Sequence, residues 1–442
     1  MFIGEFLHQP DNIKFIGMLK KIIHTFGITA FSAVLNLVVA VLISQYLGPA
    51  GKGSQSLILT TISFILIFSN LVGGATIVYL IPRFETILLI VPSYLWTVLM
   101  SLVSFFILKL TGLIESKYII HVCILAVIYS VTSIHSNIII GKQRIKESNN
   151  LVLLQTVLLV VCLLVSFIAF RIFSINSYII ALYISMGSSM LISTFLISAS
   201  FKGIELNNYA RYIPVVKQML TFGFQNQIAH ITQLLSFRLS YYVIQEYIGI
   251  AAVGVYSNGI SIVESIWMVA KSMSLVQYSY ISNSTNREES ARITLLLVKA
   301  GLYTSLLLII PLVLIPLEAY VFIFGQGFSD IKPVIITLLP GILIYNVSIL
   351  FGHYFSGTGR YNINGRISAI GLLVSAILYF TLIPMFSIRG AGLATSLSYI
   401  FTSVMFVWYF ALENRNWFTY LIPRWNDIKL VIAEFKKAKD LN

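Results

Sequence analysis

Three charged side chains interrupt two neighbouring apolar stretches in the second half of the chain. Arg238 lies within the first stretch, and Glu264 and Lys271 lie within the next. A charge at the centre of a bilayer costs about 2.5–3.5 kcal/mol even on the lenient insertion scale. We therefore expect these charges to face a water-filled path or one another. A guanidinium stays charged and offers a planar fork of donors, so Arg238 is a candidate phosphate ligand, with Lys271 as a second.

Polar residues flank each of these charges at helical spacing. At about 100° per residue, one set falls within roughly 80° on the helix expected over residues 218–246: Gln227, His230, Arg238, Tyr241 and Gln245. On the helix expected over 250–280, a second set of residues is spaced seven apart and therefore also shares one face: Ser257, Glu264, Lys271 and Tyr278. The two faces are expected to line a transport path, with Arg238, Lys271, His230, Gln227 and Tyr241 contacting the substrate.

Glu264 is the one carboxylate in the interior of an expected membrane span, because every other Asp or Glu falls in a loop, at a span end or in a tail. It is either a group that responds to protons or sodium ions, or a structural partner of Arg238 or Lys271, and both interpretations stay open. Acid–base catalysis generally requires two or more positioned groups. We therefore do not expect an enzyme.

Motifs for metals and nucleotides are absent from the sequence. The histidines are scattered without an HxxxH or HxxE spacing, and a GxxxxGK[ST] phosphate-binding loop is missing. Cys123 and Cys162 lie in apolar runs and indicate packing rather than a disulfide. We expect no metal and no cofactor, with H⁺ or Na⁺ as a possible coupling ion.

Composition places the chain among helical membrane proteins. Of its 442 residues, 58% are hydrophobic and 10% are charged, whereas soluble proteins carry about 25% charged residues. The formal net charge of +13 is attributed to lysine and arginine in cytoplasmic loops, so nucleic acid is not an expected partner.

Apolar stretches long enough to cross a core of about 30 Å predict twelve spans, at residues 22–46, 54–80, 86–108, 119–140, 150–170, 178–200, 218–246, 250–280, 292–316, 331–355, 364–385 and 389–412. Most of the 29 lysines and arginines then lie on the side of the N-terminus. This asymmetry predicts that both termini are cytoplasmic.

Five segments follow from this arrangement. They are a cytoplasmic N-terminal segment (1–21), a first six-helix bundle (22–200), a cytoplasmic hinge loop (201–217), a second six-helix bundle (218–412) and a cytoplasmic tail (413–442). Ile428, Val431, Ile432 and Phe435 recur at helical spacing in the tail. They predict an amphipathic helix on the inner leaflet, as against a frayed polar tail.

The two halves repeat one another in sequence. The segment from Tyr46 to Ser56 aligns without gaps on Tyr247 to Ser257, and it matches Gly48 with Gly249 and Gly53 with Gly254 as expected hinge or turn glycines. Two shorter motifs also recur, namely Thr-Phe-Gly at Gly27 and Gly223, and Gly-x-x-Arg at Arg144 and Arg360. Six spans per half give both halves the same orientation, so we expect a pseudo-twofold axis along the membrane normal with substrate held between the bundles.

Several segments resemble a known family. YLGPAGKGSQSLILTTISFILIFSNLVGGATIVYLIPR resembles the opening spans of polysaccharide-biosynthesis transporters, the O-antigen or repeat-unit flippases of the Wzx type. GFQNQIAHITQLLSFRLSYYVIQEYIGIAAVGVYSNGISIVE resembles the start of their second half, and FGQGFSDIKPVIITLLP, SGTGRYNINGRI and IPMFSIRGAGLATSLSYI resemble their last three spans. The likeness covers most of residues 20–412.

The resemblance implies the all-α fold of the multidrug/oligosaccharidyl-lipid/polysaccharide exporter superfamily, with two six-helix bundles and a cationic cavity. It implies a flippase that moves an undecaprenyl-pyrophosphate-linked oligosaccharide, for O-antigen, lipopolysaccharide or related polysaccharide biosynthesis, to the outer face of the bacterial plasma (inner) membrane. Ion-gradient coupling by antiport, contact with membrane lipid and other polysaccharide-assembly membrane proteins as partners are also implied. Relatives often carry an R-x-D pattern where this chain has Arg238-Leu-Ser240, which leaves Glu264 as the substitute for the coupling carboxylate.

Three other functions compete with this interpretation. A cation-coupled multidrug exporter of the same fold is expected to carry carboxylates in its cavity, and the positive charges here argue against it. A membrane polysaccharide polymerase is expected to need a large outer loop with reactive side chains, which the expected topology lacks. A plain scaffold or channel does not account for the charged spans or the repeat.

Overall fold

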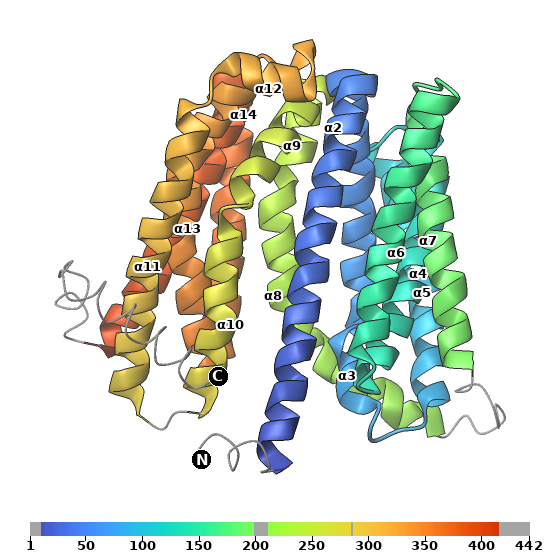
Figure 1. The fold of residues 1–442 in the computed structure, drawn as a ribbon, viewed down its shortest axis with the longest axis vertical. Coiled ribbons are helices and arrows are strands. Elements are labelled where there is room, and N and C mark those ends of the chain that lie inside the picture. Colours follow the sequence, from blue (N-terminus) through green and yellow to red (C-terminus); the bar gives the residue numbers. More distant parts are fainter. Residues whose placement is uncertain (1–9, 199–210, 284–285, 415–442) are drawn as a thin grey trace, which may run out of the picture. The chain divides into compact units, whose positions relative to one another are not determined.

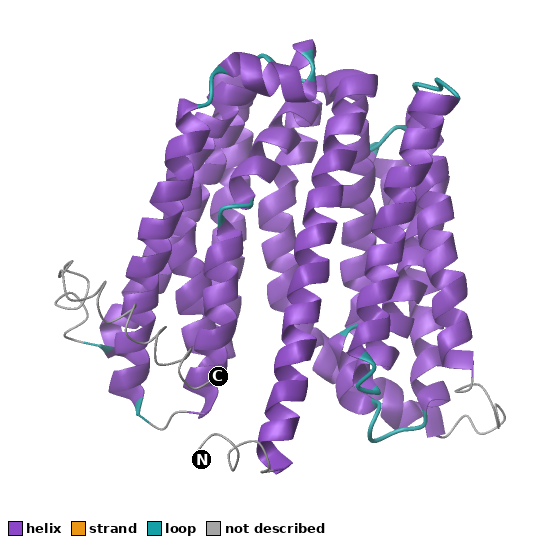
Figure 2. Cartoon of the chain, in the orientation of Figure 1, coloured by secondary structure: helices purple, strands orange, loops and turns teal. Residues whose placement is uncertain are grey.

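The computed structural model describes residues 10–198, 211–283 and 286–414, and its described part consists of helices joined by short loops, without a strand (Figures 1 and 2). It divides into two compact units, Met1–Ile231 and Thr232–Asn442. The predicted tail helix and most of the predicted hinge loop lie outside the described residues, so these predictions and the segment boundaries remain predictions.

The helices agree with the predicted all-α membrane fold. Among the described residues, eight helices are long and apolar enough to cross a membrane, or nine if one bent pair counts as a single span. Two of them, at Gly27–Leu80 and Tyr361–Glu413, have 54 and 53 residues, and a span needs about 20. Each therefore holds two spans. With α8 (Tyr212–Tyr247), which is 36 residues long but more polar, every one of the twelve predicted spans corresponds to a helical segment.

The first unit is built around α5. Its elements are α2 (Pro10–Gly73), α3 (Ala75–Leu80), α4 (Thr86–Thr111), α5 (Ser116–Gly141), α6 (Ile145–Leu164), a π-helical turn (Val165–Ala169), α7 (Ile175–Ile197) and the first part of α8. Helix α5 packs against α2, α4, α6 and α7, and its Val122, Leu125 and Ala126 are fully buried. Helix α2 begins at Pro10, earlier than the predicted start of the first span.

The second unit is built around α13. It contains the last part of α8, followed by α9 (Ile250–Glu264), α10 (Trp267–Asn283), α11 (Arg287–Leu314), α12 (Leu317–Phe324), a 3₁₀ turn (Gln326–Phe328), α13 (Ile331–Gly357) and α14 (Tyr361–Glu413). Helix α13 packs against α9, α10, α11 and α14 (Figure 1, yellow-green to red). It is the most enclosed of the apolar helices, so side chains that α8 and α9 direct toward it are shielded from lipid.

The backbone repeats between the two units. Among the described residues, eight have a positive φ, and they form four pairs at equivalent junctions between spans: Gly48 and Gly249, Gly112 and Gly325, Gln143 and Gly359, Arg171 and Ser387. The first pair is extended in the region that only glycine tolerates well, with ψ near 180° (φ/ψ 66°/−171° at Gly48 and 113°/171° at Gly249). The units therefore reverse the chain at corresponding places.

The span predicted at 250–280 is not one straight helix. Helix α9 ends at Glu264, α10 begins at Trp267, and their axes differ by 45°. Backbone bonds at the break reach back three residues, from Ser265 to Ile262 and from Ile266 to Val263, which is the tighter 3₁₀ pattern. The prediction that Glu264 and Lys271 share one continuous helical face is therefore wrong.

Candidate functional site

Arg238 and Glu264 form a two-armed ion pair inside the second unit. Nη1 of Arg238 donates to Oε1 of Glu264 at 3.1 Å, and Nη2 donates to Oε2 at 2.9 Å. Helix α8 carries the arginine, and the glutamate is the last residue of α9, at the break before α10. The structure therefore places the carboxylate with Arg238 and not with Lys271.

This pair is shielded but not sealed from solvent. The side chains keep 25% and 17% of their surface exposed. Removing two charges from water is costly, and parallel hydrogen bonds between guanidinium and carboxylate recover part of that cost. An anion that reaches the exposed edge can compete with the carboxylate for the same donors.

Aromatic rings surround the pair. The guanidinium carbon of Arg238 lies 5.5 Å from the centroid of the Tyr241 ring, within the range of a cation–π contact. Tyr241 is buried and meets Tyr256 edge to face at 5.9 Å. Tyr241 is therefore a buried ring beside the guanidinium, and its direct contact with substrate remains a prediction.

Four further rings form a cluster that sequence reasoning missed. Phe237, Trp267, Tyr345 and Tyr399 lie 4.7–5.6 Å apart by their centroids. The Trp267 indole donates to the Ile342 carbonyl at 3.1 Å, and the Tyr399 hydroxyl is buried without a hydrogen-bond partner among the described residues. Because the rings come from α8, α10, α13 and α14, no spacing along the chain brings them together.

Lys271 lies apart from the ion pair on the adjoining helix. Its side chain is exposed on α10, and its Nζ lies 5.8 Å from the Trp267 ring. Among the described side chains it forms no ion pair. The ammonium is therefore available to an anionic ligand, whereas Arg238 must first give up Glu264.

The stripe predicted along α8 divides between the units. Gln227 and His230 belong to the first unit, and Arg238 and Tyr241 belong to the second. Gln227 is buried, with its amide nitrogen 3.5 Å from the Asn70 carbonyl, whereas His230 is exposed. Gln227 therefore packs within its own unit.

The predicted turn glycines separate into two classes. Gly48 and Gly249 have a positive φ at chain reversals, where a side chain would be strained. Gly53 and Gly254 lie inside α2 and α9 and are buried, so they permit close packing and do not form turns. That part of the hinge prediction is corrected by the structure.

A buried histidine elsewhere has a structural environment. His135 is fully buried in the first unit, with Nδ1 2.8 Å from the Ser193 hydroxyl and Nε2 bonded to the Tyr94 hydroxyl. Both ring nitrogens are satisfied. In the part of the chain that the structure describes, no three histidine, cysteine or carboxylate side chains gather as a metal site would require.

Comparisons with known proteins agree on the fold. No family model matches the chain. The capsular polysaccharide biosynthesis protein CapF of Staphylococcus aureus is 34% identical over 88 residues, which is 20% of this chain and 22% of that protein. The lipid II flippase MurJ in an inward closed conformation matches with a TM-score of 0.70 and 14% identity, over 94% of this chain and 93% of that one.

A multidrug resistance MATE family transporter of the MOP superfamily, in an inward-facing conformation, also matches. Its TM-score is 0.64 at 14% identity, and the match covers 88% of this chain and 96% of that one. Identities this low establish fold and leave activity open. The chain is a multi-pass membrane protein with the fold of MOP superfamily transporters.

Proposed function

We propose that this chain is a polysaccharide-biosynthesis flippase of the Wzx type. It moves an undecaprenyl-pyrophosphate-linked oligosaccharide from the cytoplasmic to the outer face of the bacterial plasma membrane, for O-antigen, capsule or a related surface polysaccharide. The fold shared with a lipid II flippase and the local likeness to a capsular biosynthesis protein support this assignment. The termini are proposed to be cytoplasmic.

The Arg238–Glu264 pair is the observation that carries the proposal. A pyrophosphate presents several oxygens to a guanidinium, and charge-assisted bonds to phosphate match those to carboxylate in strength. Arg238 therefore exchanges Glu264 for the pyrophosphate when substrate enters. Lys271 adds a second positive charge on α10.

The exchange leaves a carboxylate without its partner in a shielded position. An isolated buried carboxylate is unfavourable, so Glu264 takes up a proton or a sodium ion while substrate occupies Arg238. Release of the pyrophosphate lets Arg238 return and expels that cation. Substrate and coupling ion are thereby bound together and released together, so this exchange links their binding but does not make it alternate, as antiport would require.

Lipid-linked sugar in a strain that lacks this chain tests the proposal. An impermeant lectin or glycosidase reports which membrane face carries the pyrophosphate-linked unit. We expect the unit to accumulate on the inner face and the wild-type gene to restore its delivery. Normal delivery in the deletion strain would rule out this function.

Variants of the pair sharpen the test. Arg238→Gln and the doubly neutral Arg238→Gln/Glu264→Gln should both fail to restore delivery at wild-type protein levels. Arg366→Gln is the matched control, because it removes an exposed arginine on α14 and should restore delivery fully. Full activity of the doubly neutral variant would exclude Arg238 as the pyrophosphate ligand.

A multidrug exporter is the second candidate, because a MATE multidrug transporter shares the fold. Organic cations are best bound by free carboxylates, but the described carboxylate inside a span is already paired with Arg238. Lys271 would also repel such a substrate. Resistance to cationic dyes on expression, together with normal sugar delivery in the deletion strain, would favour the exporter.

A further inference from the structure

The two Gly-x-x-Arg motifs form the same turn, once in each unit. In the first unit α5 ends at Gly141, Gln143 has φ 62°, the Gln143 N–H donates to the Ile140 carbonyl at 2.8 Å, and the Arg144 N–H donates to the Ile139 carbonyl at 3.0 Å. These are the two bonds of a Schellman motif. The arginine is thereby fixed as the third residue after the last residue of α5.

The second unit reproduces this turn after α13. Gly359 has φ 78°, its N–H donates to the Ser356 carbonyl at 3.0 Å, and the Arg360 N–H donates to the Phe355 carbonyl at 2.7 Å. The first glycine of each motif packs on an isoleucine. A Cβ on Gly141 would lie 2.4 Å from Cγ2 of Ile81, and one on Gly357 would lie 2.9 Å from Cγ2 of Ile281. Each turn is therefore pressed against the end of another span.

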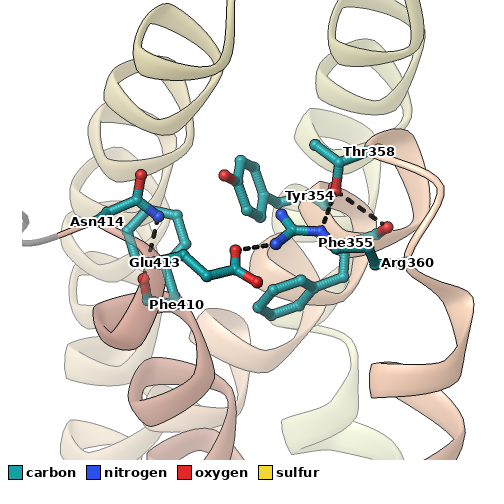
Figure 3. A network of polar contacts seen from close by, with 7 residues as sticks. All are labelled: Tyr354, Phe355, Thr358, Arg360, Phe410, Glu413 and Asn414. Atoms are coloured by element: carbon teal, nitrogen blue, oxygen red, sulfur yellow. Dashed lines mark hydrogen bonds and ion pairs between the residues drawn. The ribbon is translucent and has the colours of Figure 1, made fainter.

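Both arginines then contact the end of a further helix in their own unit, α7 in the first unit and α14 in the second. Nη1 of Arg144 donates to the carbonyl of Leu196, near the end of α7, at 3.1 Å. Arg360 forms an ion pair with Glu413, the last residue of α14, and its Nε donates to the Thr358 hydroxyl at 3.1 Å (Figure 3).

Aromatic rings hold the second arginine in place. Its guanidinium carbon lies 5.4 Å and 5.1 Å from the ring centroids of Tyr354 and Phe355 (Figure 3). In the first unit, Glu147 in the first turn of α6 pairs with Arg144 instead. The contact between helices is thus a backbone hydrogen bond in the first unit and an ion pair between side chains in the second.

We propose that these two arginine turns are equivalent clamps that hold one end of each unit as a rigid block while the protein changes conformation. Each clamp joins three parts of its unit. In the first unit these are the end of the second span, the turn after the fourth span and the end of the sixth span. In the second unit they are the end of the eighth span, the turn after the tenth span and the end of the twelfth span. The clamp rests on the contacts described above, and its role during transport rests on the proposed function.

Hydrogen exchange tests the clamp without any substrate. In purified protein, Glu413→Gln and Arg360→Gln should each speed amide exchange at the end of α14, over residues 405–414, about fivefold, the factor expected for the loss of an ion pair worth about 1 kcal/mol. Glu147→Gln should leave the exchange rate at the end of α7 unchanged, because the hydrogen bond from Arg144 to the Leu196 carbonyl remains. Arg366→Gln is the matched control on α14. Wild-type exchange at 405–414 in both variants would overturn the clamp.

Cross-linking tests whether the contact between positions 360 and 413 can stay closed throughout transport. Arg360→Cys/Glu413→Cys should be treated in cells with a short permeant bismaleimide, with the wild-type chain treated alike to control for Cys123 and Cys162. Delivery of lipid-linked sugar should continue at no less than its rate before linking. Loss of delivery on linking the pair alone would show that the clamp opens. Because hydrogen exchange needs no cargo, it decides the clamp even if the chain carries a different substrate.

Discussion

Neutralising Arg238 and Glu264 together should destabilise the protein less than neutralising either one alone. Removing one partner of a buried ion pair leaves the other charge unpaired, at a cost of about 3–5 kcal/mol in fully buried cases. Here 25% and 17% of the two side chains remain exposed. Water therefore offsets part of the loss, and we expect about 2 kcal/mol for each single variant.

The doubly neutral variant has neither an unpaired charge nor the cost of shielding two charges from water. Replacing a buried pair by neutral groups is often close to neutral, so we expect a loss of about 1 kcal/mol. The coupling between the two sites is then about 3 kcal/mol, the upper end for residues in contact.

Thermal unfolding in detergent measures these effects. For a unit of about 200 residues, 1 kcal/mol shifts Tm by about 2–4 °C, so Arg238→Gln and Glu264→Gln should each lower it by about 4–8 °C. The Tm of the double variant should lie about 2–4 °C below that of the wild type, and the control Arg366→Gln should leave Tm unchanged. If the Tm of the double variant instead falls by the sum of the two single decreases, the two side chains do not stabilise one another. The proposed exchange of Glu264 for substrate would then have no basis.

The remaining predictions concern the repeated turns and glycines. Gln143→Gly should raise the free energy of unfolding by about 0.5–1 kcal/mol, because glycine relieves the positive φ of 62°, and Gly359→Ala should lower it by about 1 kcal/mol for the converse reason. Denaturant or thermal titration measures both, and a loss of stability in Gln143→Gly would contradict the assigned turn. Gly223→Ala should cost more than 1 kcal/mol, because its Cβ would lie 1.7 Å from the Leu71 carbonyl oxygen. Gly27→Ala meets no atom within 4 Å and should be neutral or slightly stabilising, so equal losses at these two repeat positions would refute the packing.

Much of the candidate site could be predicted from residue types. Charge inside an apolar span is costly wherever the span lies, so Arg238, Glu264 and Lys271 stand out without any structure. The choice of partner could not be predicted, because Arg238 and Lys271 are both within plausible reach of Glu264 in sequence. The aromatic cluster and the division of the α8 stripe were missed for the same reason, since both depend on how distant helices pack.

The amino-acid sequence alone establishes the membrane class, the twelve apolar segments and the repeat, because hydropathy and glycine spacing act locally. It also identified Gly48 and Gly249, since a positive φ favours a residue without a side chain. The packed fold is needed to show that Gln143, Arg171 and Ser387 also adopt a positive φ, that the helix breaks after Glu264, and that Arg144 and Arg360 connect helices within each unit. These features depend on contacts between residues far apart in the chain, whose packing can outweigh local preference.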